Sequence, residues 1–249
     1  MDWQMGLRGA FIAVLLTAAY PALAQKNDYF DRTEMVYFEI NLGTHQPDEG
    51  SDLFNFFEET STFDSEDLDG FVVDFKLYYQ LNNRLSIGGG LSVYEESVSA
   101  ESRDFVDIDG FGIVNETEFQ TTWVGAQMIW TPFGAGEQFG SKGWAPKFFV
   151  PYLTAGIGFK AYEVVQVGEF VDETDPNDPF IFADRFEADG ESLSTRFGCG
   201  FRLNLHRNVD LNFSLQQEWA EDDVAGSYSG FGDLDLGSKS AMIGVTFRI

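Results

Sequence analysis

The stretch LSTRFGCGFRLNL, residues 193–205, alternates between two kinds of side chain at every second position. One set is large or apolar: Leu193, Phe197, Cys199, Phe201, Leu203 and Leu205. The other set is small or polar: Ser194, Arg196, Gly198, Gly200, Arg202 and Asn204. Because successive side chains on a strand point to opposite faces, the stretch predicts a strand with one face in an apolar medium and the other in a crowded polar interior.

Seven further stretches alternate in the same way, near residues 35–45, 70–81, 84–96, 118–132, 148–165, 209–219 and 239–249. Most are about 10–13 residues long, which exceeds the usual strand of about 5–6 and matches the length that a tilted strand needs to cross a bilayer. A soluble β-sandwich also has alternating strands, and a soluble barrel places its bulky apolar residues inward. We therefore predict an all-β fold over residues 35–249, an eight-stranded antiparallel up-and-down transmembrane β-barrel.

The joins between these stretches differ in length. Those at 82–84 and 206–208 are very short, that at 133–147 is intermediate, and those at 46–69, 96–117, 166–191 and 221–238 are long and polar. Short turns at one end and long loops at the other are typical of bacterial outer-membrane barrels, whose short turns are periplasmic and whose long loops are extracellular.

The two short joins also predict a register. Leu81 and Leu85 both face outward, so residues 82–84 form a three-residue loop, in which an asparagine takes the left-handed conformation. Tyr78 then lies opposite Gly88 on the inner face. The same count across 206–208 places Arg196 opposite Glu218, which predicts an ion pair in the lumen.

The first 24 residues are typical of a cleaved signal peptide. Arg8 precedes the apolar run 11–20, and Ala22-Leu23-Ala24 forms a cleavage site. Residues 25–34 are then a periplasmic tail. The first 24 residues contain one acid and one base, Asp2 and Arg8, so their removal leaves the net charge at −26. No later apolar run reaches about 18 residues, which excludes a helical membrane protein.

Composition excludes further classes. The chain has 41 acidic and 15 basic residues, the wrong balance for nucleic acid or for an amphipathic helix on anionic lipid. Its 26 phenylalanines argue against acidic disorder. The single cysteine, Cys199, allows no intrachain disulfide and is interpreted as a small residue on a strand face, with a reactive thiol as the alternative.

The segments 151–159 (PYLTAGIGF) and 242–249 (MIGVTFRI) resemble the small eight-stranded outer-membrane barrels, the OmpA-transmembrane-domain-like, opacity-type and OmpW-type group. The resemblance covers residues 35–249 and is one of pattern. It implies an outer-membrane location and delivery by the barrel assembly machinery, which reads the C-terminal strand. The group usually ends in an aromatic residue, whereas this chain ends in Ile249 with Phe247 two positions earlier.

Catalysis is not predicted. Lipid A deacylases resemble this architecture and use Ser, His and an acid, but this chain has only His45 and His206. His45 is placed at the extracellular end and His206 in a periplasmic turn, so they cannot form one site. Asn208 stands where the deacylase pattern needs serine. His45 is interpreted as a solvated loop histidine, with a lone general base near Asp48 as the alternative.

The inner positions carry charges of both signs: Glu39, Asp74, Lys76, Lys160, Arg196, Arg202, Asp210, Glu218 and Arg248. Eight strands leave an interior only wide enough for side chains, and buried charges must pair. A salt-bridged plug is one reading of this set. A narrow gate for ions or small solutes is the other.

The long joins hold acids and aromatics. Asp172, Glu173, Asp175 and Asp178 could provide a weak Ca²⁺ or Mg²⁺ site, with solvated acidic loops as the alternative. No other cofactor is predicted. The aromatics gather at 53–57 and at 180–182, as a partner surface or as strands extending beyond the bilayer.

The sequence thus predicts an outer-membrane barrel with a structural or surface-interaction role and acidic extracellular loops. A narrow porin or OmpW-like transport channel is the alternative, and a lipid-modifying enzyme is the third candidate. The partners expected are outer-membrane lipids and lipopolysaccharide, the assembly machinery and an extracellular partner of the long loops, with no nucleic acid.

Overall fold

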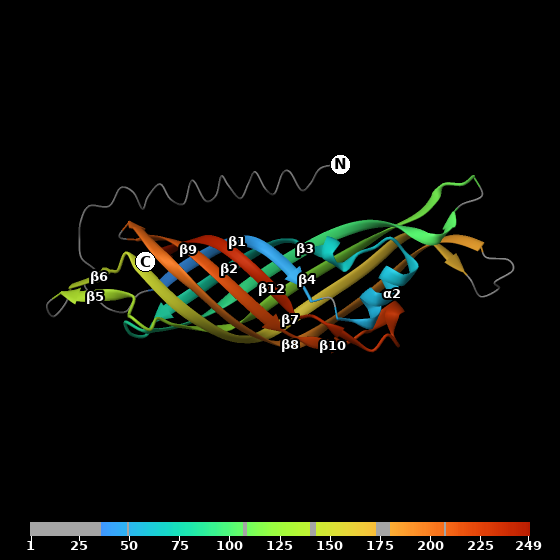
Figure 1. The fold of residues 1–249 in the computed structure, drawn as a ribbon. Helices are drawn as coiled ribbons and strands as arrows, with labels where there is room; N and C mark the ends of the chain where they lie inside the picture. The colour runs from blue at the N-terminus through green and yellow to red at the C-terminus, as the bar shows by residue number, and fades with distance from the viewer. Residues whose placement is uncertain (1–35, 49, 107–108, 140–142, 173–179, 207) are drawn as a thin grey trace.

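The computed structural model describes residues 36–48, 50–106, 109–139, 143–172, 180–206 and 208–249. The signal peptide and tail predicted at 1–34 lie outside these residues. Eight antiparallel strands close a barrel in the order β1–β2–β3–β4–β7–β8–β9–β12 (Figure 1). They are β1 (Val36–Pro47), β2 (Gly70–Gln80), β3 (Leu85–Val106), β4 (Gly112–Trp130), β7 (Phe149–Asp172), β8 (Phe180–His206), β9 (Val209–Trp219) and β12 (Ser238–Arg248). The predicted eight-stranded barrel is confirmed.

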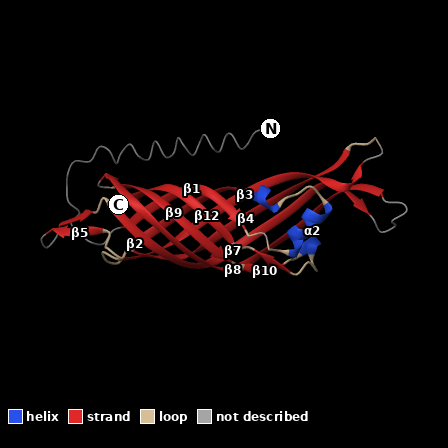
Figure 2. Cartoon of the chain, in the orientation of Figure 1, coloured by secondary structure: helices blue, strands red, loops and turns tan. Residues whose placement is uncertain are grey.

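Smaller elements lie at the two ends of the barrel. The end with the tight turns, here called the turn end, carries the hairpin of β5 (Gly136–Phe139) and β6 (Gly143–Pro146). The opposite loop end carries α2 (Asp52–Thr60), η1 (Ser65–Leu68), β10 (Glu221–Asp223), η2 (Gly226–Tyr228) and β11 (Asp233–Asp235) (Figure 2). Among the described helices, none is long and apolar enough to cross a membrane.

Four strands are much longer than predicted. β3, β4, β7 and β8 run on past the ends of β1, β2, β9 and β12 and project at the loop end (Figure 1). The prediction of long loops at 96–117 and 166–191 was therefore wrong, since β3 pairs with β4 as far as Val106↔Gly112 and β7 pairs with β8 as far as Asp172↔Phe180. Strand extension, one of the two readings of the aromatics at 180–182, accounts for their place in β8.

These strands were predicted too short because their apolar side chains change from the outward to the inward face along the strand. In the part of the barrel nearer the turn end, the outward residues are apolar, as at Leu91 and Val93 of β3. Beyond Val93 the outward residues of β3 become polar, while the inward residues Val98 and Ala100 are apolar and buried. The projecting part is thus built like a water-soluble sheet, with its apolar side turned to the molecule's own core.

The tight turn after β2 forms without the predicted left-handed asparagine, because no described residue other than glycine has a positive φ. Instead the Asn82 side-chain oxygen accepts hydrogen bonds from the backbone N–H groups of Arg84 (2.8 Å) and Leu85 (3.0 Å). The predicted register is confirmed, with Tyr78 opposite Gly88. A Cβ at Gly88 would lie 2.6 Å from a ring carbon of Tyr78, so only glycine leaves room for this tyrosine.

Candidate functional site

The charged side chains of the inward positions all lie buried in the lumen. The strands place them there because each stands on the same parity as the glycines and serines of its strand. All nine are 7% exposed or less: Glu39, Asp74, Lys76, Lys160, Arg196, Arg202, Asp210, Glu218 and Arg248. They form two networks along the barrel axis.

The network nearer the turn end centres on Arg202. Its guanidinium donates to one carboxylate oxygen of Glu39 at 3.0 and 2.6 Å, and that oxygen also accepts from the Thr246 hydroxyl at 3.1 Å. The guanidinium lies 4.5 Å from the ring centroid of Tyr37 and 5.1 Å from that of Tyr152. The desolvated cation therefore has both a counter-charge and aromatic faces around it.

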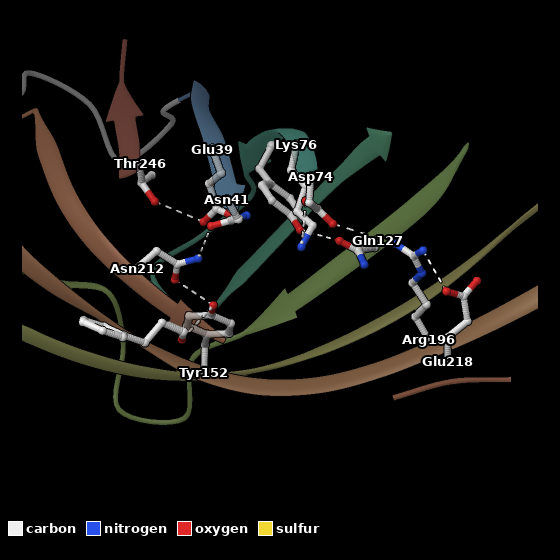
Figure 3. Close-up of polar contacts among 12 residues, drawn as sticks. Glu39, Asn41, Asp74, Lys76, Gln127, Tyr152, Arg196, Asn212, Glu218 and Thr246 are labelled. Carbon is white, nitrogen blue, oxygen red and sulfur yellow. Dashed lines mark hydrogen bonds and ion pairs between the residues drawn. The ribbon is translucent and has the colours of Figure 1, made fainter. Parts of the chain in front are cut away.

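Three further contacts complete this network. Arg248 pairs with Asp210. The Asn212 amide bridges two strands by donating to Asn41 (2.8 Å) and accepting from the Tyr152 hydroxyl (2.7 Å) (Figure 3). Together they join β1, β7, β9 and β12 across the lumen.

The network nearer the loop end centres on Arg196. The register places Arg196 opposite Glu218, and the two side chains form the expected ion pair at 2.8 Å (Figure 3). Arg196 also lies 3.8 Å from Asp74 and 3.9 Å from the Trp123 ring centroid. Asp74 in turn pairs with Lys76 at 3.1 Å. Cations and carboxylates alternate here, which offsets part of the cost of burying them.

The space left beside Arg196 is small. A cavity between Ser92, Arg196, Glu218 and Ser238 has a volume of about 10 Å³, room for about one water molecule. Side-chain packing therefore narrows the lumen at this level to less than a solute's width. The plug and the gate both remain predictions for this set.

A hydrophobic cap fills the barrel mouth at the loop end. Its centre is α2, which begins at the N-cap Ser51, whose hydroxyl accepts from the backbone N–H of Phe54 at 3.3 Å. The Phe57 ring contacts Phe63 at 5.7 Å and Tyr228 of η2 at 5.5 Å between centroids. The cap thus packs the segment after β1 against the segment after β9, over the inward apolar residues of the long strands.

The sequence interpretation of residues 53–57 was wrong. Leu53, Phe54 and Phe57 are buried in the cap, and only Phe56 is exposed, so these residues are neither a partner surface nor a strand extension. They lie on one face of a helix whose buried side points into the barrel. Lys160 ties the cap to the lumen, since its ammonium donates to the carbonyl of Leu236 at 2.6 Å and lies 3.6 Å from Glu218.

Trp144 covers the lumen at the turn end. This β6 residue is buried, its indole N–H donates to the Asn83 side-chain oxygen at 3.4 Å, and its ring lies 5.9 Å from the Arg248 guanidinium. The sequence interpretation treated 133–147 as a simple join and missed this residue. A tryptophan inside a turn region was the available signal.

The prediction that His45 is a solvated loop histidine was wrong. It is buried in β1, with its Nδ1 3.0 Å from the Ser240 hydroxyl and its ring 4.4 Å from that of Tyr94. His206 ends β8 at the turn end, as expected. Cys199 is free and exposed on the outer, apolar face of β8.

The proposed divalent-cation residues fall mostly beyond the described chain. Asp172 ends β7, whereas Glu173, Asp175 and Asp178 lie outside the described residues. Within the described ranges, no three His, Cys, Asp or Glu side chains are placed to hold a metal ion.

Like charges face each other in the β10–β11 hairpin beside the cap. Its register pairs Glu221 with Asp235 and Asp223 with Asp233. The neighbouring Asp233 carboxyl, through a shared hydrogen bond and its like charge, raises the pKa of Asp223 above its usual range. Acidic pairs directly opposite one another destabilise a two-stranded sheet when ionised.

The β10–β11 hairpin should therefore become more stable at low pH. A carboxyl whose pKa is raised by folding adds stability at low pH, and that stability is lost as the pH rises through the raised pKa. We expect the hydrogen-exchange protection factors of residues 221–236 to increase as the pH falls from neutral. The double variant D223N/D233N should show high protection at every pH, and a wild-type profile that is flat with pH would contradict this expectation.

A family model described as an outer membrane protein beta-barrel domain matches residues 10–248. No curated protein gives a significant match. Neisserial surface protein A is 14% identical, with 88% of this chain and 98% of that chain covered and a TM-score of 0.47. OprG from Pseudomonas aeruginosa is 11% identical, with 89% and 98% covered and a TM-score of 0.46. Ail, the attachment invasion locus protein of Yersinia pestis, is 11% identical, with 87% and 97% covered and a TM-score of 0.43.

Proposed function

Because the chain belongs to the outer membrane protein β-barrel domain family, we propose that it is a closed barrel of the bacterial outer membrane with a structural and surface-interaction role. The turn end faces the periplasm and the loop end faces the outside of the cell, in keeping with the short turns and long projections of such barrels.

The sealing of the lumen carries this proposal. The cap closes the loop end, the Arg196 and Arg202 networks fill the middle, and Trp144 covers the turn end. Each seal involves buried groups that would lose several contacts if it opened. The alternative of a narrow channel would require the Arg196–Glu218 pair to separate, together with the contacts of Arg196 to Asp74 and of Glu218 to Lys160.

The projecting β7–β8 hairpin supports the surface-interaction part. Phe180 and Ile181 are exposed near its tip, and Phe170 and Phe182 pack beside them at 6.0 Å between centroids. β9 pairs with β8 only as far as Thr195, so none of the described strands pairs with the other edge of β8 above that point. Exposed apolar side chains beside an unpaired strand edge are typical of a partner-binding surface.

Catalysis has little support in this arrangement. The buried His45 contacts a hydroxyl and an aromatic ring rather than a carboxylate that could orient it as a base. We propose that the protein is not an enzyme.

Secretion and assembly follow the family pattern in this proposal. A signal peptide at 1–24 delivers the chain to the periplasm, and β12, which closes the barrel against β1, is the strand that the assembly machinery reads. Phe247 lies opposite Phe38 in that seam and is the aromatic nearest the C-terminus.

Residues 25–249, refolded into a planar bilayer, should show no discrete single-channel openings, because three layers of packed side chains obstruct the axis. Insertion is checked by heat-modifiable gel mobility. Orientation is checked on intact cells, where Phe180→Cys should react with a membrane-impermeant maleimide and the lipid-facing Cys199 should not. Reproducible openings from an inserted, heat-modifiable barrel would make the lumen a gated pore and would overturn the closed-barrel function.

A further inference from the structure

The outer wall of the barrel is hollowed over five neighbouring strands. The register places Thr44, Ala241, Leu215, Cys199 and Leu153 side by side in one outward row. Two overlapping depressions, of about 860 and about 650 Å³, both include all five residues. Thr44, Ala241 and Cys199 carry small side chains, which makes room for the hollow along this row.

Large side chains border the hollow. Phe71 projects at one side and Phe197 at the other, both more than half exposed. Phe201 and Phe213 stack at 4.8 Å between centroids on the turn-end side. A saturated hydrocarbon chain could lie over the small residues between these rings. Such packing alone selects no lipid, because one acyl chain is as apolar as the next.

The polar rim on the loop-end side supplies the selectivity. The next outward row holds Gln46, Lys239 and Gln217, which all border the second depression. The Lys239 side chain is 65% exposed and its ammonium lies 3.6 Å from a carboxylate oxygen of Asp48, which leaves room for a second anion at the ammonium. The Gln46 amide donates to Asp69 at 2.6 Å and the Gln217 amide to the carbonyl of Glu218 at 3.2 Å, so each keeps one N–H for a further acceptor. With the Lys239 ammonium they match a phosphate joined to an acyl chain in the hollow.

The charge of this rim differs from that of the other walls. On β3, β7 and β8 the first outward charged residues beyond the apolar belt are Glu95, Glu163 and Glu191, whereas on β12 it is Lys239. Carboxylates repel phosphate, so β12 is the strand among these four on which an anionic lipid gains a direct contact. Two carboxylates also stand at this rim, Asp48 beside Lys239 and Asp69 beside Gln46.

We propose that this hollow is a binding site for one lipopolysaccharide molecule, with a lipid A phosphate on Lys239 and an acyl chain over Thr44, Ala241 and Cys199. Lipopolysaccharide is the anionic lipid of the outer leaflet, and Lys239 lies at the loop-end border of the apolar belt. The inference rests on the outer-membrane orientation of the proposed function and goes beyond it by naming the lipid and its site.

The test is titration of the full-length mature protein in detergent micelles with diphosphorylated lipid A, read by native mass spectrometry. Lys239→Gln should weaken lipid A binding roughly fivefold, the scale of one exposed charge contact. Asp48→Asn should strengthen it, because the competing carboxylate charge is removed. Ala241→Phe fills the hollow and should weaken binding even with Lys239 in place.

Arg84→Gln is the matched control, since it removes the same charge from an exposed site at the turn end and should leave binding unchanged. Heat-modifiable mobility confirms that each variant is folded. Equal binding by wild type, Lys239→Gln and Ala241→Phe would overturn the site, and equal retention of phosphatidylglycerol in place of lipid A would overturn the choice of lipopolysaccharide. The readout is independent of conductance, so a pore with a Lys239-dependent lipid would refute the closed-barrel function and leave this site standing.

Discussion

Replacing Glu39 by glutamine is expected to destabilise the barrel by about 3–5 kcal/mol, the cost of leaving a buried charge without its partner. The Arg202 guanidinium makes its ion pair with Glu39, and Asp210, the other carboxylate of that network, is engaged by Arg248. The tyrosine rings around Arg202 cannot replace a full counter-charge. The free energy of unfolding is measured by urea titration of the barrel in lipid vesicles.

A surface pair provides the matched control. Arg185 and Glu187 lie 3.1 Å apart but are 57% and 59% exposed, so Glu187→Gln should change stability by no more than about 1 kcal/mol. The double variant E39Q/R202M should recover much of the loss, because it removes the orphaned cation. If E39Q cost no more than E187Q, the lumen would have to be hydrated enough to screen Arg202, and the sealed-barrel interpretation would fail.

Truncating Phe57 to alanine should detach the cap while leaving the membrane barrel intact. Phe57 joins α2 to η2 through its contacts with Phe63 and Tyr228, and deleting a buried aromatic ring typically costs about 3–5 kcal/mol. Hydrogen exchange should accelerate in residues 51–68 and 224–236, while β1 and β12 keep their protection.

Phe133→Ala is the control for this variant. Phe133 is 71% exposed at the turn end, so its removal should leave exchange at the loop end unchanged. Unaltered protection of the cap in F57A, or a loss of protection through the whole barrel, would contradict a cap that packs as a separate unit on the strands.

The parts of the fold that the sequence predicted correctly depend on local counts. A short turn fixes the register of the two strands that it joins, so counting outward from residues 82–84 and 206–208 was enough to pair Tyr78 with Gly88 and Arg196 with Glu218. The placement of the other lumen charges follows from the same parity rule.

The parts of the fold that the sequence did not predict depend on where the surroundings of a strand change from lipid to water, or on contacts between residues far apart in the chain. A search for bulky outward residues stops at Val93, although alternation continues with Val98 and Ala100 on the inner side. The helix α2 did leave a signal, since Ser51 precedes Leu53, Phe54 and Phe57 at helical spacing. By contrast, Trp144 was visible only as a tryptophan inside a turn region, and the residues beside it do not indicate its contact with Arg248.

The reversal of the apolar face along β3, β4, β7 and β8 divides the molecule into two regions with opposite tolerance to mutation. On the turn-end side of the reversal, an arginine substituted at an outward position must enter hydrocarbon. On the loop-end side, the same substitution places the arginine in water. Outward residues of the projecting part can therefore be substituted without affecting the part that lies in the membrane. The reversal also marks a depth in the membrane: the step from Val93 to Glu95, and the step from Leu193 to Glu191, lie where the apolar, lipid-facing surface ends and the water-facing surface begins.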